Sequence, residues 1–396
     1  MSGQQPVSPG SLASSSTGPL LAPLPPLTAI PGDIRTLADY ARRAEAHMPA
    51  GTWHHIQSGA GPQTTLAANC AQFDRYRLVP RMLTDMRGAT TELDLFGQRH
   101  AAPILLAPVA YHRLVHPHGE AATISAATAL DTTMAVSTLS SIPLEDVAHA
   151  ARAAAAELGR AGPPPLWFQL YLQADRGHSA ELVRRAETAG YQVLVLTVDA
   201  SVKRSDFALP SGVEAANLRG MKRLSHNAGI EDGRILFGTP LLDAAPTWDS
   251  LAWLRAQTRL PIVVKGLLSP EDARLARDHG ADGIIVSNHG GRVLDGVASP
   301  LDMLPAMVDA VEDGIPLLLD SGVRQGTDVL KALALGARAT LIGRPQLHAL
   351  AVAGVQGVVH MLHILRAELE LAMAHAGCAS LPGVGRSILH EFRPLP

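Results

Sequence analysis

The 396-residue sequence has few cysteines and few aromatic residues. Its two cysteines, Cys70 and Cys378, exclude a disulfide framework, and they show no C-x-x-C spacing. This usage fits a reducing compartment, so we expect a cytoplasmic protein. Aromatic residues make up 4% of the chain and hydrophobic residues 47%, so the core must be built mainly from Ala, Leu, Val and Ile. Such side chains suit strands and helices packed in layers.

The sequence also lacks an excess of charge of one sign. The formal net charge is -3, the two signs are interspersed, and no basic stripe indicates a nucleic-acid partner. One uncharged run, Gln346 to Leu365, is long enough to span a membrane. It contains three His, two Gln and two Gly, which favour buried helices of a soluble protein. We therefore expect no membrane partner.

Residues 1–32 carry no charged side chain and are rich in Pro and Ser, which predicts a disordered tail. They lack the basic start and continuous apolar stretch of a signal peptide. The remainder, residues 33–390, is expected to be one domain. It begins with a helical preface: one predicted helix over Asp33–His47, then a turn and a second helical stretch within Gly51–Asn69.

From Pro103 onward, short apolar runs alternate with Ala-rich helical segments, the pattern of βα units around a parallel sheet. Eight such runs predict a single (β/α)8 barrel, the TIM barrel, in which reactive groups sit at the carboxyl ends of the strands. The connection from Ala200 to Pro246, after the fourth strand, is long enough to be a functional loop. The predicted strands are Ile104–Ala110, Met134–Leu139, Trp167–Leu172, Val193–Val198, Ile262–Lys265, Gly283–Ser287, Pro316–Leu319 and Ala339–Ile342.

The end of the sixth strand carries Ser287-Asn288-His289-Gly290-Gly291-Arg292. Histidine titrates near neutrality and can accept a hydroxyl proton, and the planar fork of arginine matches a carboxylate. His289 and Arg292 are therefore candidates for a base and an anion clamp. The alternative is a loop histidine beside an exposed arginine.

Two glycine-rich segments follow the last two strands: Asp320-Ser321-Gly322-Val323-Arg324 and Gly343-Arg344. Many barrels hold a phosphate between these loops, since glycine lets backbone N–H groups approach the oxygens and arginine supplies positive charge. The pair predicts a phosphate site. Simple turns are the alternative.

Two further polar residues end strands four and five. Lys265 would be a buried cation in the barrel mouth and needs an anion; a reduced flavin could supply it, and a Schiff-base lysine is the rival chemistry. Asp199 could orient His289, or it could merely cap a helix. His112, His116 and His118 do not predict a metal site, because Pro117 interrupts their spacing.

Taken together, these segments resemble the FMN-dependent 2-hydroxy acid dehydrogenase/oxidase family, which includes glycolate, lactate and mandelate oxidases. The resemblance covers roughly Asp33 to Ile388. It rests on APVAYHRLVHPHGE (107–120), FQLY (168–171), LTVD (196–199), VKG (264–266), SNHGGR (287–292), DSGVRQGTDVLKALALGA (320–337) and IGRP (342–345).

The resemblance implies FMN as cofactor, a small 2-hydroxy acid as substrate, O2 or another electron acceptor, and a homo-oligomer, in this family a tetramer. It implies that His289 is the base with Asp199 behind it, that Arg292 binds the substrate carboxylate, and that Tyr171 hydrogen-bonds near the reacting end. The implied FMN-binding residues are Ala107, Pro108, Val109, Ser137, Gln169, Thr197, Lys265, Ser287, Asp320, Ser321, Gly322, Arg324, Gly343 and Arg344.

The sequence departs from the family pattern at three places. His55 stands where a carboxylate-binding tyrosine is usual, and Leu139 stands where glycolate oxidases have a tryptophan, which should widen the pocket. The loop after Asp199 is shorter than usual, so the loop arginine is Arg204 or is missing. The segments around His55 and Tyr111 look most similar to mandelate or hydroxymandelate oxidases, which favours a bulky substrate.

Three functional hypotheses are open at this point. The first is an oxidase that returns electrons to O2 and forms hydrogen peroxide; a dehydrogenase using a quinone is its close variant. The second is an FMN-binding protein with altered or lost catalysis, motivated by His55 and the short loop. The third is an FMN barrel isomerase such as the type 2 isopentenyl diphosphate enzyme, against which the His289/Arg292 pair argues.

Overall fold

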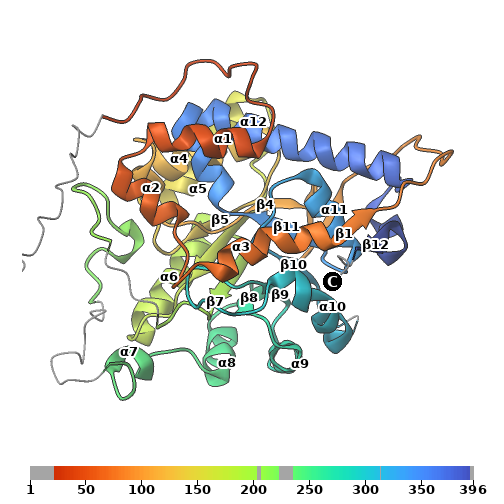
Figure 1. Ribbon diagram of the computed structural model, residues 1–396. Coiled ribbons are helices and arrows are strands. Elements are labelled where there is room, and N and C mark those ends of the chain that lie inside the picture. Colours follow the sequence, from red (N-terminus) through yellow and green to blue (C-terminus); the bar gives the residue numbers. More distant parts are fainter. Residues whose placement is uncertain (1–21, 203–206, 223–234, 313, 393–396) are drawn as a thin grey trace, which may run out of the picture.

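Eight parallel strands close into a barrel in the computed structural model, which describes residues 22–202, 207–222, 235–312 and 314–392 (Figure 1). The barrel closes where β11 pairs with β4, with Leu341 opposite Leu105. All eight predicted strands are confirmed. Their bounds are β4 Ile104–Leu106, β5 Met134–Ser137, β6 Leu166–Leu170, β7 Val193–Thr197, β8 Ile262–Leu267, β9 Gly283–Val286, β10 Leu317–Leu319 and β11 Ala339–Ile342.

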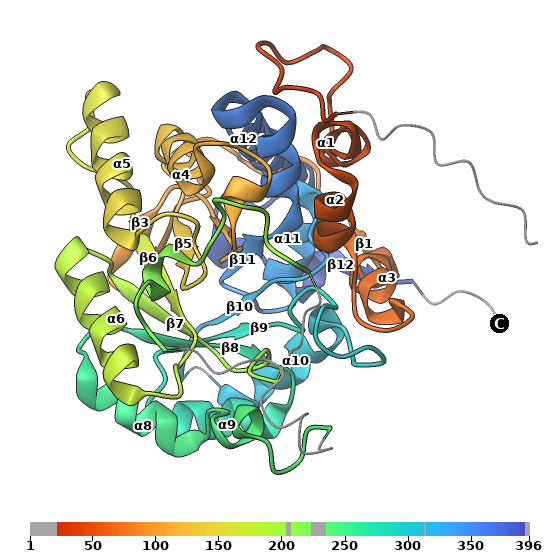
Figure 2. The same cartoon turned by 90° about the vertical axis from the view of Figure 1, so that its left-hand side faces the viewer.

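Helices form a layer outside the strands (Figure 2). Local signals start two of these helices: Ser269 accepts hydrogen bonds from the backbone at the start of α9, and Thr247 caps α8. The helices of this layer are α4 Gly119–Ala129, α5 Leu144–Glu157, α6 Arg176–Ala189, α8 Trp248–Gln257, α9 Pro270–Asp278, α10 Pro300–Val311, α11 Gly326–Ala334 and α12 Arg344–Ala376.

The two faces of each strand bury different side chains. One apolar cluster fills the barrel interior and includes Leu105, Trp167, Val195 and Ile285; the other lies between strands and helices. Because side chains alternate along a strand, the interior positions continue upward into polar residues at the carboxyl ends. These are Ser137, Gln169, Thr197, Lys265, Ser287 and Asp320, all of them buried. The alternation of side chains along the strands therefore places these polar residues together at one end of the barrel interior, which forms the floor of a polar site.

A hairpin of β2 (Leu93–Leu95) and β3 (Gln98–His100) covers the opposite, amino-terminal end of the barrel. Leu93 and Leu95 are buried in the interior cluster, and the Trp167 indole donates a hydrogen bond to Gln98, 3.2 Å away. Phe96 packs so closely against Gly283 that a Cβ there would lie 2.7 Å from its ring. With this end plugged, access is left to the carboxyl ends of the strands.

The helical preface contains α1 (Leu37–Ala44), α2 (Ala50–Gln57) and α3 (Thr64–Ala71). The predicted helix over Asp33–His47 starts too early: Thr36 and Asp39 form a reciprocal capping box that fixes the start at Leu37. After α3 the chain enters β1 (Tyr76–Leu78), which pairs with the terminal strand β12 (Leu389–Glu391). The preface is thus joined at its end to the C-terminal strand, in a two-stranded sheet that is separate from the barrel.

The predicted disordered tail, residues 1–32, lies outside the described residues up to residue 21. In its described part, the Leu24 N–H donates to the Ala46 carbonyl at 2.9 Å and the Leu27 N–H donates to the Val352 carbonyl at 2.7 Å. This segment lies along the helical layer without regular structure.

Helix α12 contains the uncharged run and is long and apolar enough to cross a membrane. It is mostly buried within the protein, where it packs against α1, α4 and α11, and its backbone breaks at Ala353 and Gly354. This is the buried helical segment that the sequence predicted.

The long loop after β7 is anchored in its middle. The Ala216 N–H donates to the Ser140 carbonyl at 2.9 Å, and the Asn217 side chain accepts from the Leu144 N–H at 2.8 Å. The loop ends in the short helix α7 (Pro240–Asp243). Arg204, the predicted loop arginine, lies outside the described residues.

Candidate active site

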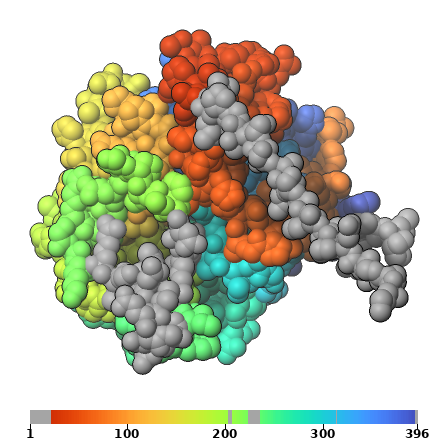
Figure 3. Space-filling model, turned by 60° about the vertical axis from the view of Figure 1, so that its left-hand side comes forward, coloured from red at the N-terminus to blue at the C-terminus, as the bar shows by residue number. Residues whose placement is uncertain are grey.

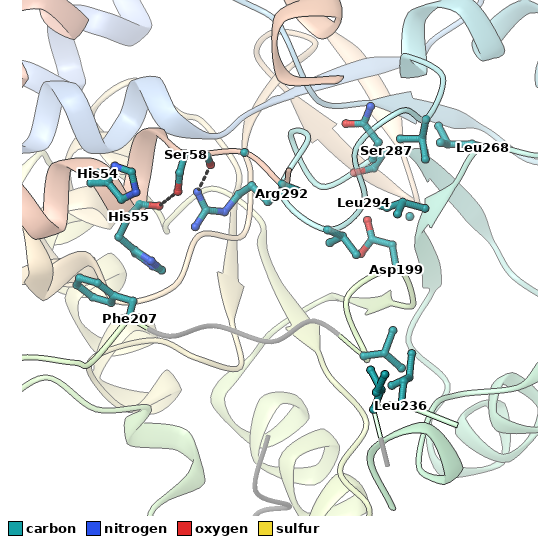
Figure 4. Close-up of a pocket in the computed structure, with 18 of the residues that line it drawn as sticks. His54, His55, Ser58, Asp199, Phe207, Leu236, Leu268, Ser287, Arg292 and Leu294 are labelled. Carbon is teal, nitrogen blue, oxygen red and sulfur yellow. Dashed lines mark hydrogen bonds between the residues drawn. The ribbon is translucent and has the colours of Figure 1, made fainter. Parts of the chain in front are cut away.

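The carboxyl ends of the strands surround a cavity of about 600 Å³. A second, more open space of about 1080 Å³ adjoins it and shares three lining residues with it, His55, Phe207 and Arg292 (Figure 4). On the surface, this region lies where the red and orange preface, the green loop and the cyan connection after β9 come together (Figure 3). The site is therefore built by three parts of the chain that are distant in sequence.

Lys265 is the buried cation at the centre of the floor. Its ammonium lies 2.9 Å from the Asp320 carboxylate and donates to the Ser287 hydroxyl at 2.7 Å. Burial lowers the pKa of Lys265, but the carboxylates of Asp320 and Asp199 outweigh it and the net shift is upward. Asp320 thus provides an anion for this buried cation, and Lys265 remains charged.

His289 and Asp199 form a second pair, with the imidazole Nδ1 2.8 Å from the carboxylate. Burial raises the pKa of Asp199, but the facing His289 and then Lys265 lower it, so the net shift is downward. The other ring nitrogen, Nε2, lies 3.5 Å from the Tyr171 hydroxyl. Burial, followed by the charge of Asp199, raises the pKa of Tyr171, which stays a neutral phenol.

Arg292 and Arg344 are held side by side by the same backbone carbonyls at the end of α2. Arg292 donates to the carbonyls of Ile56 and Ser58, both at 3.0 Å, and Arg344 donates to them at 2.8 and 3.1 Å. Arg344 also donates to the Gly290 carbonyl at 3.0 Å. Neutral carbonyls fix the direction of both guanidinium groups without neutralising them.

The uncompensated positive charge of these arginines lowers the pKa of neighbouring cationic groups. Burial, Arg292 and Arg324 lower the pKa of Arg344 to about 9. Burial, Arg324 and Arg344 lower the pKa of His348 to about 3, so this histidine stays neutral. Like charges so close together are destabilising unless an anion joins them. The cluster therefore fits the phosphate of a cofactor on the Arg344 and Arg324 side and a substrate carboxylate on the Arg292 side.

Two buried polar atoms at the barrel floor have no hydrogen-bond partner within the described protein: Gln169 Nε2 and Thr197 Oγ1. Gln169 is held by its other end, since its Oε1 accepts from the Ser137 hydroxyl at 3.0 Å. Native proteins rarely leave such groups unsatisfied. Hydrogen-bonding ring atoms of a flavin would satisfy both, so the residues present fit FMN.

The cavity gathers most of the residues predicted for cofactor and substrate. It is lined by Ala107, Pro108, Val109, Ser137, Lys265, Asp320, Ser321, Gly322, Arg324, Gly343 and Arg344, together with His55, Tyr171, His289 and Arg292. Asp199 and Ser287 line the adjoining space, and Gln169 and Thr197 are buried at the strand ends beside the floor. Tyr111 also lines the cavity, whereas His112 is buried and hydrogen-bonds Thr123 at 2.8 Å.

Sequence reasoning missed three contributors. Phe207 stacks on His55 with ring centroids 4.0 Å apart and planes 16° apart. Asn69 makes a reciprocal amide pair with Asn288, at 2.9 and 2.7 Å, which ties α3 to the His289 loop. The carbonyls that hold the arginines could not be found at all, because every residue supplies one.

The approach of α3 to the phosphate-side loop makes Gly322 a sensitive position. A Cβ at Gly322 would lie 1.9 Å from the Asn69 carbonyl oxygen, and its φ is +93°. We expect Gly322→Ala to lower the free energy of unfolding by roughly 3 kcal/mol more than Gly190→Ala, through backbone displacement. Gly190 is a matched control, with φ +92° and no atom within 4 Å. Urea unfolding measures both; equal losses would show that the close contact has no cost.

Comparison with known proteins gives the family. A family model described as FMN-dependent dehydrogenase matches residues 44–391. The chain is 47% identical to an L-lactate oxidase of Alicycliphilus denitrificans over 92% of this chain and 98% of that protein. It is 43% identical to a 4-hydroxymandelate oxidase of Amycolatopsis orientalis, over 89% and 97%.

Solved structures agree in fold. A crystal structure of mandelate oxidase superposes with a TM-score of 0.78 at 42% identity, covering 90% of this chain and 98% of that one. The chain therefore belongs to the family of FMN-dependent dehydrogenases, and FMN is its cofactor.

Proposed function

We propose that this protein oxidises a small 2-hydroxy acid to the 2-oxo acid and uses O2 as acceptor, giving hydrogen peroxide. One observation carries the proposal: an imidazole backed by a carboxylate and an arginine held by carbonyls border the same cavity. The relatives named as lactate and hydroxymandelate oxidases support it.

His289 is the proposed base. Asp199 accepts the hydrogen from Nδ1, which fixes the tautomer and leaves Nε2 to take the proton of the substrate hydroxyl. As the imidazole becomes charged, the ionised Asp199 stabilises it. FMN, when bound, would supply the acceptor for the hydrogen and two electrons that leave the α carbon. O2 would then take the two electrons and two protons, one from that hydrogen and one from the charged His289, to give hydrogen peroxide. The neutral Tyr171 phenol donates a hydrogen bond to the substrate near the reacting carbon.

Arg292 is the proposed clamp for the substrate carboxylate. Its Nη1 is occupied by the carbonyls of Ile56 and Ser58, so its other N–H groups point in a fixed direction. Burial lowers its pKa, which means that the protein itself does not compensate the charge fully. A substrate carboxylate bound to Arg292 would compensate this buried charge, which favours acids over neutral alcohols as substrates.

The substrate side chain is proposed to be lactate-like or mandelate-like. The cavity lining includes three leucines, Leu139, Leu172 and Leu209. The stacked pair of His55 and Phe207 forms another part of the wall. These flat and branched surfaces suit a methyl group or an aromatic ring and offer little to a charged side chain.

A charged His55 would help to hold the substrate carboxylate. In that role we expect KM to rise as the pH increases, because the imidazole loses its proton and with it the charge that attracts the carboxylate. Steady-state kinetics with one substrate at constant ionic strength measures this. The matched variant His55→Gln should show a KM without that step. A KM of the wild-type protein that stays flat from about pH 5.5 to 8 would remove this role for His55.

The overall reaction is tested by a substrate panel on the purified holoenzyme. We expect peroxide in amounts equal to the 2-oxo acid formed from lactate or mandelate. Turnover only with a quinone or dye would make the protein a dehydrogenase. No bleaching of the flavin when it is mixed anaerobically with these acids would instead indicate lost catalysis.

We also propose a cytoplasmic homo-oligomer. The paucity of cysteine supports the location. The segment after β1 carries Met82 and Leu83 with exposed fractions of 64% and 104%, which is unusual for large apolar side chains. Light scattering coupled to size-exclusion chromatography measures the mass of the protein in solution. The mass of a monomer would reject the proposed homo-oligomer.

A further inference from the structure

The backbone of the proposed base is tethered to the buried ion pair. The His289 N–H donates to the Ser287 hydroxyl at 3.0 Å, and that hydroxyl accepts from Lys265 at 2.7 Å. The next N–H, that of Gly290, donates to the Ser321 hydroxyl at 3.0 Å. The Ser321 hydroxyl in turn donates to Asp320 at 2.8 Å. Since Lys265 and Asp320 are 2.9 Å apart, these bonds close a ring.

The ring holds the loop in an unfavourable backbone conformation. His289 has a φ of +57°, in the left-handed region that non-glycine residues rarely adopt, and Gly290 and Gly291 follow with +65° and +71°. A residue persists in this conformation only where its surroundings fix it. The hydrogen bonds of the His289 and Gly290 N–H groups supply this constraint, because they hold the backbone on both sides of the His289 carbonyl.

Of the two serines, only Ser321 comes from another strand. Ser287 precedes His289 on the same segment, so its bond is local, whereas Ser321 follows β10 and connects the β9 loop to its neighbour. Ser321 itself has a φ of +74°. This left-handed backbone conformation is unfavourable for serine, and it places the hydroxyl between an acceptor, Asp320, and a donor, the Gly290 N–H.

We propose that Ser321 is a positioning residue: its hydroxyl couples the Lys265–Asp320 pair to the His289 loop and so sets the imidazole against Asp199. The proposal rests on the proposed function, since it takes His289 as the base. Without the hydroxyl, the Gly290 N–H loses its partner and the loop can relax away from the left-handed conformation. The imidazole then makes a poorer hydrogen bond to Asp199.

Two variants remove the hydroxyl in different ways. Ser321→Ala keeps a side chain in the unfavourable left-handed conformation, whereas Ser321→Gly also relieves that strain. A loss of activity common to both variants therefore cannot come from backbone strain. Ser125→Ala is the matched control: this serine lies on α4, and among the described residues its hydroxyl donates only to the Ala121 carbonyl of its own helix, at 2.9 Å. All three are prepared as holoenzymes.

We expect kcat with the best 2-hydroxy acid to fall about tenfold in both Ser321 variants, the loss typical of one ordering hydrogen bond, with KM nearly unchanged. Because the Asp199 carboxylate stabilises the charged imidazole that it faces, a weaker contact between them should change the acid limb of kcat/KM. Hydrogen–deuterium exchange in peptides covering residues 287–292 should become faster. Ser125→Ala should match the wild type in all three.

Two results would overturn the proposal. One is an unchanged kcat, pH profile and exchange rate in both variants. The other is a raised Kd for FMN, measured by fluorescence quenching, with a normal kcat once FMN is saturating, since Ser321 would then act only as a cofactor contact. If the wild-type protein oxidises no 2-hydroxy acid, the proposed function fails. The exchange rate of residues 287–292 then decides by itself whether Ser321 holds the loop.

Discussion

Replacing His289 with alanine should lower kcat by about 10²- to 10⁴-fold and leave FMN bound, the range expected on removal of a positioned base. His289 contacts Asp199 and Tyr171, whereas the charges on the phosphate side belong to Arg344 and Arg324. The variant should therefore purify yellow. Steady-state kinetics and the flavin content of the purified protein measure the two parts of this expectation.

His149→Ala is the control for His289→Ala, because His149 is exposed on α5, away from the cavity. It should keep full activity. The pH dependence gives a second check: the base must be neutral to accept a proton, so wild-type kcat/KM should fall at low pH, where the imidazole is protonated. A His289→Ala variant with near-normal kcat, or one with the same acid limb, would mean that another group takes the proton.

Replacing Lys265 with methionine should lower the free energy of unfolding by about 3–5 kcal/mol, the typical cost of breaking a buried ion pair from one side. Lys265 and Asp320 are 4% and 7% exposed, so the abandoned carboxylate has little access to water. The Ser287 hydroxyl would also lose one of its two donors and keep the His289 N–H. Urea unfolding at a fixed excess of FMN gives the loss.

A second substitution separates this cause from a packing defect, because it removes the unpaired charge without restoring the lost side chain. The double variant Lys265→Met/Asp320→Asn should regain most of the stability at neutral pH. If the double variant is no more stable than Lys265→Met, the unpaired charge is not the cause.

The strand pattern made much of this architecture readable in advance. Short apolar runs predicted the eight strands, and the polar residues that follow them, such as His289, Lys265 and Asp199, were expected at the carboxyl ends. These signals are local, because each depends on a few consecutive residues. The too-early start predicted for α1 shows the limit, because Thr36 and Asp39 overrode the apparent helix at Asp33.

The sequence alone thus determined a barrel with polar strand ends, a base candidate and an arginine-rich end, because these depend on side-chain identity and short-range periodicity. Tertiary structure decided which groups meet. Arg292 is oriented by a carbonyl 236 positions away in the chain, and His55 stacks on Phe207 from the long loop. Carbonyls are common to every residue, and contacts between distant segments depend on how whole elements pack, so neither leaves a mark in the local pattern.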